Sequence, residues 1–291
     1  MKASGTAPPI PFCSPPVRKM NRLPLAALAF DAVAPTFDAR FGDWLSVAAQ
    51  RRAVRRALLA ALPAGAQVLE LGGGTGEDAA WMAQNGFRVL LTDASPAMIR
   101  EARVKLAPHG VNALVVAAEE LPRFVQSHFA CGGETFDAAF SNFAPLNCVA
   151  DLDPVARSLA ALLRPGGKAM LVLFGTLSPG DMIVEMLRGR GSQALRRLKR
   201  EPVPARLGRT HFTVTYHRRR ALSAAMHPWF RLERSIGIGV FVPPSAAEPW
   251  ISRHPRLLRM LETCDRLLEQ PLAGLGDHIL YQFERTEAPD P

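Results

Sequence analysis

The sequence predicts an α/β fold of the Rossmann-like, doubly wound type, with helices on both faces of a largely parallel sheet. Two observations lead to this fold class. Short apolar runs alternate with helical patterns between residues 63 and 175, as expected for parallel strands joined by helices. A glycine-rich turn at residues 72–76 follows the first of these runs and leads directly into a helical pattern at Glu77, as in nucleotide-binding sheets.

The N-terminal residues divide into a tail and a helical cap. Residues 1–20 are rich in proline and contain no uninterrupted apolar segment, so we expect a disordered tail there. Residues 21–62 are expected to form a helical cap, in which the repeat Phe30-Asp31 and Phe37-Asp38 makes short amphipathic turns before a long helix. We expect the arginines of that helix to form a solvated face: Arg51, Arg52, Arg55 and Arg56.

The first strand of the core is predicted at residues 67–71, and the turn after it indicates the type of ligand. An acid, Glu70, stands near its end, and glycines follow at positions 72, 74 and 76, whereas dinucleotide-binding turns have the spacing Gly-x-Gly-x-x-Gly. The last position of that fingerprint is Glu77 here. Its carboxylate would repel a pyrophosphate at the start of the helix, so the turn predicts a cofactor without phosphates.

The second strand is predicted at residues 88–92 and ends in Asp93. An acid at about this distance from the glycine turn commonly accepts hydrogen bonds from ribose hydroxyls. Ser95 and Pro96 then supply a helix N-cap and a first-turn proline, and Met98 begins the apolar face of the next helix. We expect the carboxyl ends of the two strands to be neighbours.

The glycine turn and the strand that ends in Asp93 together resemble the first two motifs of class I S-adenosylmethionine-dependent methyltransferases. Residues 136–143 resemble the fourth strand of that family, and residues 162–168 resemble the turn before its fifth. The resemblance implies S-adenosylmethionine as the cofactor, with Ser141 and Asn142 near its methionine end and Glu119 beside its adenine. The cofactor-binding residues implied in this way are Glu70, Gly72, Gly73, Gly74, Gly76, Asp93, Ala94, Met98, Ala118, Glu119, Ser141, Asn142 and Phe143.

Further strands complete the predicted sheet. They are expected at residues 112–116, 136–141 and 168–174, which gives a cofactor-binding core at residues 63–175. The resemblance implies that runs starting near Trp229 and Asp277 are the last two strands of a seven-stranded sheet, completed by residues 221–291. We expect the first of these runs to extend to Pro243-Pro244, because proline cannot donate to the ladder.

An inserted lid is predicted at residues 176–220, a segment rich in arginine and interrupted by glycine and proline. It supplies much of the formal net charge of +9. Such a patch can hold RNA phosphates or attract an anionic small substrate, and it can equally be a solvated helix face. The run Ser141-Asn142-Phe143-Ala144-Pro145 departs from the Asn/Asp-Pro-Pro-aromatic motif of DNA amino-methylating enzymes, so nucleic acid is the less favoured partner.

We expect methyl transfer to a small-molecule acceptor, at oxygen rather than at nitrogen or carbon. The alternatives are an RNA methyltransferase that uses the basic lid and a protein that binds the cofactor without catalysis. His211 is the preferred candidate for a general base, with His217 and His278 as further candidates, and Tyr216 and Asn147 are candidates to orient the acceptor. His211 and Tyr216 fall on opposite faces of a predicted strand, so they cannot both face the site.

Composition indicates whether the protein has membrane spans, metal sites or disulfides. No stretch is long and apolar enough to span a bilayer. The four cysteines are scattered without a Cys-x-x-Cys pair, so we expect neither a metal site nor a disulfide framework, and we predict a cytoplasmic location. The sequence does not indicate the acceptor or the oligomeric state.

Overall fold

A computed structural model describes residue 10 and residues 23–287 of the chain. Its main sheet has seven strands in the order β3-β2-β1-β4-β5-β9-β8, and β9 alone among them runs antiparallel to its neighbours. The strands are β1 (Gln67–Leu71), β2 (Arg88–Asp93), β3 (Asn112–Val115), β4 (Phe136–Ser141), β5 (Leu163–Phe174), β8 (Phe230–Ile238) and β9 (His278–Arg285). The predicted Rossmann-like sheet is therefore confirmed.

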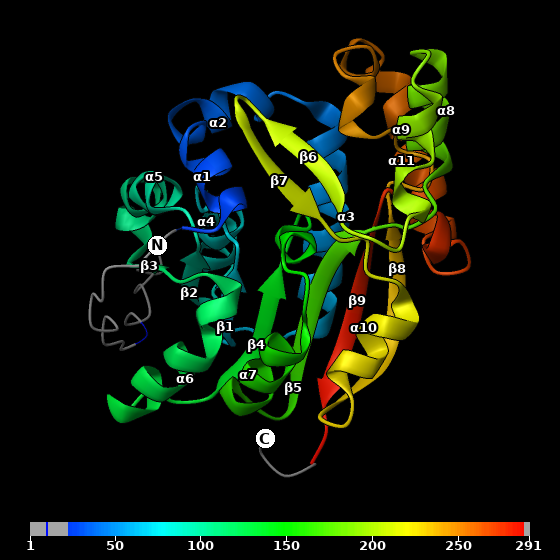
Figure 1. Ribbon diagram of the computed structural model, residues 1–291. Coiled ribbons are helices and arrows are strands. Elements are labelled where there is room, and N and C mark those ends of the chain that lie inside the picture. Colours follow the sequence, from blue (N-terminus) through cyan, green and yellow to red (C-terminus); the bar gives the residue numbers. More distant parts are fainter. Residues whose placement is uncertain (1–9, 11–22, 288–291) are drawn as a thin grey trace, which may run out of the picture.

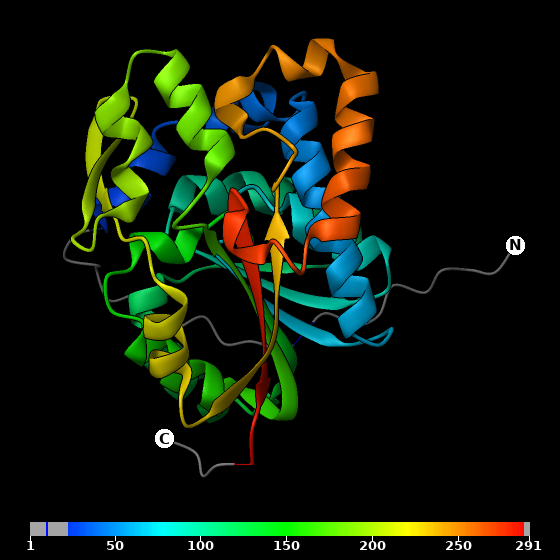
Figure 2. The same cartoon turned by 90° about the vertical axis from the view of Figure 1, so that its right-hand side faces the viewer.

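Helices cover both faces of this sheet (Figures 1 and 2). One face packs against α3 (Leu45–Ala61), α4 (Glu77–Gln84) and α5 (Pro96–Leu106). The other face packs against α6 (Leu121–Ala130), α7 (Asp153–Leu162) and α10 (Arg219–Met226). The apolar residues of β1, β4 and β5 alternate between the two clusters, because successive strand residues point to opposite faces. This explains why the parallel strands are apolar throughout.

Two segments far apart in the sequence meet above the carboxyl ends of the strands. The first contains α1 (Leu25–Asp31) and α2 (Ala34–Phe41), and the second leaves the sheet after β5 as α8 (Pro179–Leu187), α9 (Gly191–Ala194) and the hairpin of β6 (Val203–Leu207) and β7 (Thr210–Val214). Figure 1 shows the hairpin beside α1 and α2. The rings of Phe30 in α1 and Phe212 in β7 lie 6.3 Å apart, so these segments are in contact. The domain boundaries assigned to the cap, core and lid stay predictions.

Two strand limits differ from the prediction. β8 ends at Ile238, because Gly239 turns the chain with a φ of 68° and Asp265 of α11 (Pro255–Leu268) accepts the N–H of Phe241. The expectation that this strand continues to Pro243-Pro244 was therefore wrong. β5 already begins at Leu163, which pairs with Phe136 before a register shift near Asp137.

The predicted tail at residues 1–20 lies outside the described residues except for Ile10. Ile10 is buried against the core, and its carbonyl oxygen accepts a hydrogen bond of 3.1 Å from the Asn112 amide. Cys148 and Cys264 are free cysteines. None of the described helices could cross a bilayer.

Gly175→Ala is expected to lower the free energy of unfolding by about 1–3 kcal/mol, the cost of overpacking a rigid contact. A Cβ at Gly175 would overlap the carbonyl oxygen of Gly276, so the adjoining ends of β5 and β9 would have to separate. Urea unfolding followed by circular dichroism measures the change. Gly191→Ala is the matched control, since a Cβ there meets nothing within 4 Å, and equal stability of the two variants would contradict the prediction.

Candidate functional site

The carboxyl ends of β1, β2 and β4 bring most of the predicted cofactor residues together. β1 lies between β2 and β4, and the strand order reverses there, which opens a crevice for ligands at this edge of the sheet. Glu70, Asp93 and Ser141 stand at or next to the ends of these three strands. The turn at residues 72–76 joins β1 to α4 at the same edge.

The turn after β1 requires glycine at several positions for steric reasons. Gly72 has a φ of 65°, and a Cβ there would overlap the ring of Pro145, which follows β4. A Cβ on Gly73 would lie 2.7 Å from the Leu91 side chain and 2.9 Å from the Glu70 carboxyl carbon. The turn therefore lies directly against the β4 side of the crevice and directly over Glu70.

Glu70 is a buried carboxylate without a partner. Its side chain is 2% exposed, and its Oε2 accepts no hydrogen bond from the described residues. Burial, reinforced by the negative charge of Asp78, raises the pKa of Glu70 well above its usual value. A buried, unpaired carboxylate is costly, so this position fits a ligand that brings a cation, such as the ammonium of a methionine moiety.

Asp93 holds the glycine turn and the start of α5. Its Oδ2 accepts the N–H of Gly74 at 2.9 Å, and its Oδ1 accepts the N–H of Ser95 at 2.8 Å. Burial raises the pKa of Asp93, and these two N–H groups oppose the rise. Each carboxylate oxygen can accept a second hydrogen bond, so Asp93 fits the predicted role of ribose acceptor.

Asp78 links the cap helix to the tip of β4. It is 4% exposed and forms ion pairs with Arg51 at 2.7 Å and with Arg55 at 2.8 Å. It also accepts a hydrogen bond of 2.8 Å from the Asn142 amide. The expectation that Arg51 and Arg55 belong to a solvated face was wrong, because their partner comes from a different helix and could not be read from local spacing.

The cap is tied to the cofactor turn by the aspartates of the Phe-Asp repeat. Asp31 accepts hydrogen bonds from the Ser95 hydroxyl at 2.9 Å and the Ala97 N–H at 2.7 Å. Asp38 accepts one from the Thr75 hydroxyl at 2.6 Å. Phe30 and Phe37 pack against Met98, which is 1% exposed. The Phe-Asp repeat is evident from the sequence, but the hydrogen bonds of its two carboxylates are not, because their partners lie far along the chain.

The chain after β4 adopts a turn that non-glycine residues rarely form. Phe143 and Ala144 have φ values of 57° and 64°, and Pro145 then begins a short 3₁₀ helix, η3 (Pro145–Cys148). Strained backbone of this kind is common at ligand sites. Arg51 lies over the Phe143 ring, 4.8 Å from its centre, and so covers the turn from the side of the cap.

The predicted adenine-side residues lie at the end of β3. Ala118 and Glu119 start the 3₁₀ helix η2 (Ala118–Glu120), where Ala118 is partly buried and Glu119 is exposed. Burial, with smaller contributions from Glu119 and Asp93, raises the pKa of the Cys148 thiol to about 11. Cys148 therefore lies near both carboxylates and stays protonated, a neighbour that sequence reasoning missed. Ala94 and Gly76 adjoin the helix starts, and the N–H of Gly76 donates to the Gly73 carbonyl at 3.0 Å.

The candidate acceptor residues do not gather at one point. Asn147 is fully buried. Its side-chain nitrogen donates to Thr215 O at 2.6 Å, and its side-chain oxygen accepts the N–H of Phe174 at 3.0 Å, which leaves it a structural role. His211 is exposed on the outer face of β7, whereas Phe212 faces the cap. The structure therefore does not support His211 as a base.

Three further candidates lie at the base of the hairpin or beyond it. His217 is buried against Val149 O at 2.9 Å, and burial lowers its pKa. Tyr216 packs against Phe174, with ring centres 5.9 Å apart. The His278 imidazole also stacks on Phe174, with ring centres 4.9 Å apart. Tyr216 and His278 are thus the two candidates that share an aromatic neighbour at the end of β5.

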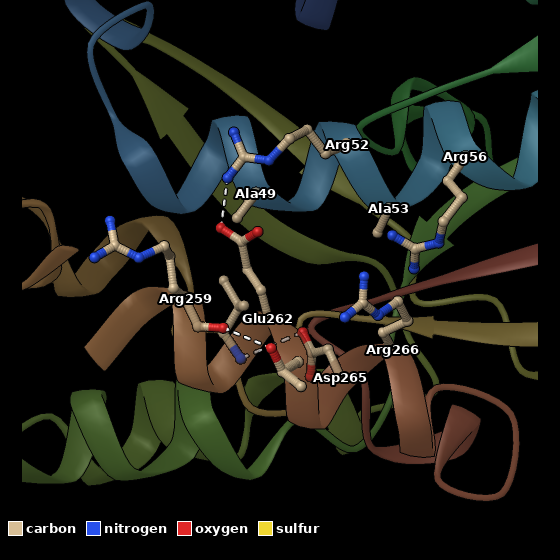
Figure 3. A pocket seen from close by; sticks show the side chains of 10 residues that line it. Ala49, Arg52, Ala53, Arg56, Arg259, Glu262, Asp265 and Arg266 are labelled. Carbon is tan, nitrogen blue, oxygen red and sulfur yellow. Dashed lines mark hydrogen bonds and ion pairs between the residues drawn. The ribbon is translucent and has the colours of Figure 1, made fainter. Parts of the chain in front are cut away.

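A separate hollow of about 230 Å³ lies between α3 and α11 (Figure 3). Its arginines face carboxylates across the helix interface: Arg52 pairs with Glu262, and Arg56 pairs with Glu269 at 2.6 Å. None of the strand-end residues lines it. We assign these contacts to helix packing, and Arg52 and Arg56 are themselves exposed, as expected for a solvated face. No cluster of metal-binding side chains occurs among the described residues.

Comparison with known proteins bears on the family. Residues 68–167 match a family model described as a methyltransferase domain, and this segment runs from β1 through the glycine turn and Asp93 into β5. Residues 68–167 of the chain are thus a methyltransferase domain. The resemblance to class I S-adenosylmethionine-dependent methyltransferases is thereby confirmed.

Curated relatives match about half of the chain. A ubiquinone/menaquinone biosynthesis C-methyltransferase of Shewanella frigidimarina is 32% identical over 160 residues, covering 52% of this chain and 60% of the relative. A biotin biosynthesis bifunctional protein of Cellvibrio japonicus is 33% identical over 160 residues, covering 54% and 28%. The matches thus span less than two thirds of these relatives.

Solved structures share the fold at low identity. A putative S-adenosylmethionine-dependent methyltransferase from Listeria monocytogenes has a TM-score of 0.55 and 16% identity, covering 82% of this chain and 98% of its own. A Burkholderia thailandensis 1,6-didemethyltoxoflavin N1-methyltransferase, solved with S-adenosylhomocysteine, has a TM-score of 0.52 and 22% identity, covering 90% and 88%. The [4+2]-cyclase SpnF has a TM-score of 0.55 and 15% identity, covering 96% and 99%. The fold thus serves more than one reaction.

Glu70→Gln is expected to stabilise the protein without ligand by about 1 kcal/mol at pH 8. Because folding raises the pKa of this carboxyl, the wild-type protein becomes less stable as the pH rises from the pKa of the unfolded state towards that of the folded state. The gain from glutamine should therefore vanish near pH 4. Urea unfolding at both pH values measures this difference. A gain that is the same at pH 4 and pH 8 would contradict the burial of an unpaired carboxylate.

Asp93→Ala is expected to weaken binding of S-adenosylhomocysteine about 10- to 100-fold, because hydrogen bonds to a charged acceptor contribute about 1.5–3 kcal/mol. Isothermal calorimetry measures the affinity. Asp43→Ala provides the control, since Asp43 is exposed and lies outside the crevice. Unchanged affinity of the Asp93 variant would remove the ribose assignment.

Proposed function

We propose that the protein transfers a methyl group from S-adenosylmethionine to a small-molecule acceptor, at an acceptor oxygen. The observation that carries this proposal is the presence of two carboxylates at one crevice. Glu70 lies beneath the glycine turn without a hydrogen-bond partner for its Oε2, and Asp93 lies at the neighbouring strand end. The two positions suit the ammonium and the ribose of one extended cofactor. No phosphate site accompanies them, because Glu77 occupies the first position of α4.

The chain's own groups act by binding and orientation. Bound S-adenosylmethionine supplies an activated methyl group for an in-line displacement. The glycine turn, Asp93 and the strained turn at Phe143 hold one side of the crevice, and Asp78 fixes the two sides to each other through Arg51 and Asn142. Alignment of this kind can lower a barrier by about 7–11 kcal/mol.

A small acceptor fits the cover over the site better than a polynucleotide does. The contact of Phe30 with Phe212 closes the space above the strand ends with aromatic rings. The lid arginines expected to bind RNA are partly used inside the protein, since Arg196 pairs with Asp181 at 2.9 Å and Arg197 pairs with Asp277 at 2.8 Å. We therefore favour a small molecule over RNA.

The acceptor atom and the location are proposed on narrower grounds. The curated relatives include proteins named C-methyltransferases, so carbon is the direct competitor of oxygen. A binding protein without catalysis stays the rival outside methyl transfer. The cytoplasmic location stays a prediction.

Calorimetric titration with S-adenosylmethionine, S-adenosylhomocysteine and NAD is expected to show micromolar binding of the first two and none of NAD. A screen of phenols, alcohols and amines with radiolabelled methyl donor then identifies the acceptor, and mass spectrometry of the product locates the new methyl group. Binding of NAD alone would overturn the cofactor, and binding without turnover would favour the non-catalytic rival. RNA binding is tested with Lys199→Glu/Arg200→Glu, since both residues are exposed and charge reversal there spares the buried ion pairs.

A further inference from the structure

His278 lies where β5 and β9 meet, next to the turn after β4. It is the first residue of β9 and pairs in register with Phe174, the last residue of β5. Its side chain is on the same face of the sheet as Leu280, the face that α3 covers. The imidazole stacks on Phe174 at 4.9 Å and meets the edge of Phe143 at 5.8 Å. Phe143 belongs to the strained turn after β4, so the ring adjoins the crevice itself.

Asp277 holds this imidazole from behind. His278 Nδ1 lies 3.2 Å from Asp277 Oδ2 in an ion contact that lacks the alignment of a hydrogen bond, and both residues are almost fully buried. Burial alone would raise the pKa of Asp277, but His278 and Arg197 outweigh it and hold the pKa of this carboxyl far below its usual value. The carboxylate is therefore ionised throughout the neutral range. An ionised acceptor at this distance favours a proton on Nδ1 and leaves the lone pair on Nε2.

The position of Asp277 is fixed on several sides. Arg197 donates to its Oδ1 at 2.8 Å and to its carbonyl oxygen at 2.7 Å, and Gln50 of α3 donates to its Oδ2 at 3.2 Å. The N–H of Gly175 also bonds the Asp277 carbonyl, at 2.9 Å. Arg197 lies in η4 (Arg196–Leu198) of the lid and pairs with Asp181 of α8 as well. The lid therefore helps to orient the carboxylate that orients the imidazole.

Nε2 of His278 stays available. No residue in the described part of the chain hydrogen-bonds this atom, whereas the Nε2 of His217 is taken by Val149 O. The charged and titratable groups around the ring are Asp277 and Arg197 behind it, Arg51 over Phe143, and Tyr216 against Phe174. A carboxylate behind one imidazole nitrogen and a free second nitrogen at a ligand crevice is the arrangement used by catalytic Asp-His pairs.

We propose that His278 is the general base for an aromatic hydroxyl acceptor bound in the crevice beside Phe143, with the charge of Asp277 favouring its tautomer. This inference rests on the proposed function. A lone pair of the acceptor oxygen forms the bond to the methyl carbon, and the carbon–sulfur bond breaks with its electrons remaining on sulfur, which leaves a neutral thioether. The acceptor proton passes to His278 Nε2 and then to water.

The tautomer is tested first, without any acceptor. Nitrogen-15 histidine spectra of the full chain with S-adenosylhomocysteine are assigned by difference, using His278→Gln and, as a matched control, the exposed His211→Gln. We expect the signal lost in His278→Gln to show a proton on Nδ1 and a bare Nε2 at neutral pH. A proton on Nε2 in that state would overturn the proposal.

The role as base is tested by turnover of the acceptor found in the screen. His278→Gln should lower kcat about 10²- to 10⁴-fold, because the glutamine amide cannot accept the proton of the acceptor hydroxyl. Affinity for S-adenosylhomocysteine should stay within twofold, and His211→Gln should match the wild type. Full activity of His278→Gln would overturn the base while leaving methyl transfer intact. Absence of transfer by the wild type would instead count against the proposed function, and the tautomer measurement would stand.

Discussion

The contact between the glycine turn and the β4 turn is the constraint on which the rest of the site depends. Gly72 lies so close to Pro145 that no side chain fits between them, and this approach fixes how far the two sides of the crevice can separate. Pro145 follows two residues in the left-handed region, so the close contact and the strained turn occur together. The β4 turn then leads to Asn147, which binds both the hairpin and the end of β5. Cofactor turn, β4 tip and lid are thus connected in one series of short contacts.

Buried charge reinforces this series at two points. Asp78 binds Arg51, Arg55 and Asn142, and Asp277 binds Arg197, Gln50 and His278. Each carboxylate joins α3 to another part of the fold, the first to the tip of β4 and the second to the start of β9. Buried ion pairs contribute little net stability against apolar packing, but loss of one partner leaves an isolated charge. Their value here is the fixed orientation of the groups around the crevice.

The sequence was sufficient to predict the parts of the molecule that depend on local pattern. The strand at 67–71, the glycine turn and Asp93 follow from spacing within about 30 residues, because strand period and turn chemistry are local properties. The carboxylate contacts of Asp78 and Asp277 reach helices far away in the sequence, and no periodicity records them. His211 and His278 show the same limit. Both were candidates by residue type, but only the pairing of β9 with β5 brings His278 to the crevice.

The anchoring of the cap has a consequence for how this chain can diverge. Asp31 and Asp38 lie before residue 68, where the family match begins, yet they hold the start of α5 and the residue Thr75 in the glycine turn. Arg51 is also outside that segment and binds Asp78 within it. The segment that must be transferred as a unit is therefore longer than residues 68–167, which match the family model. A chimera that exchanged the cap for that of another protein would have to import these three side chains with it, or the exchanged piece would alter the cofactor turn as well as the cover above it.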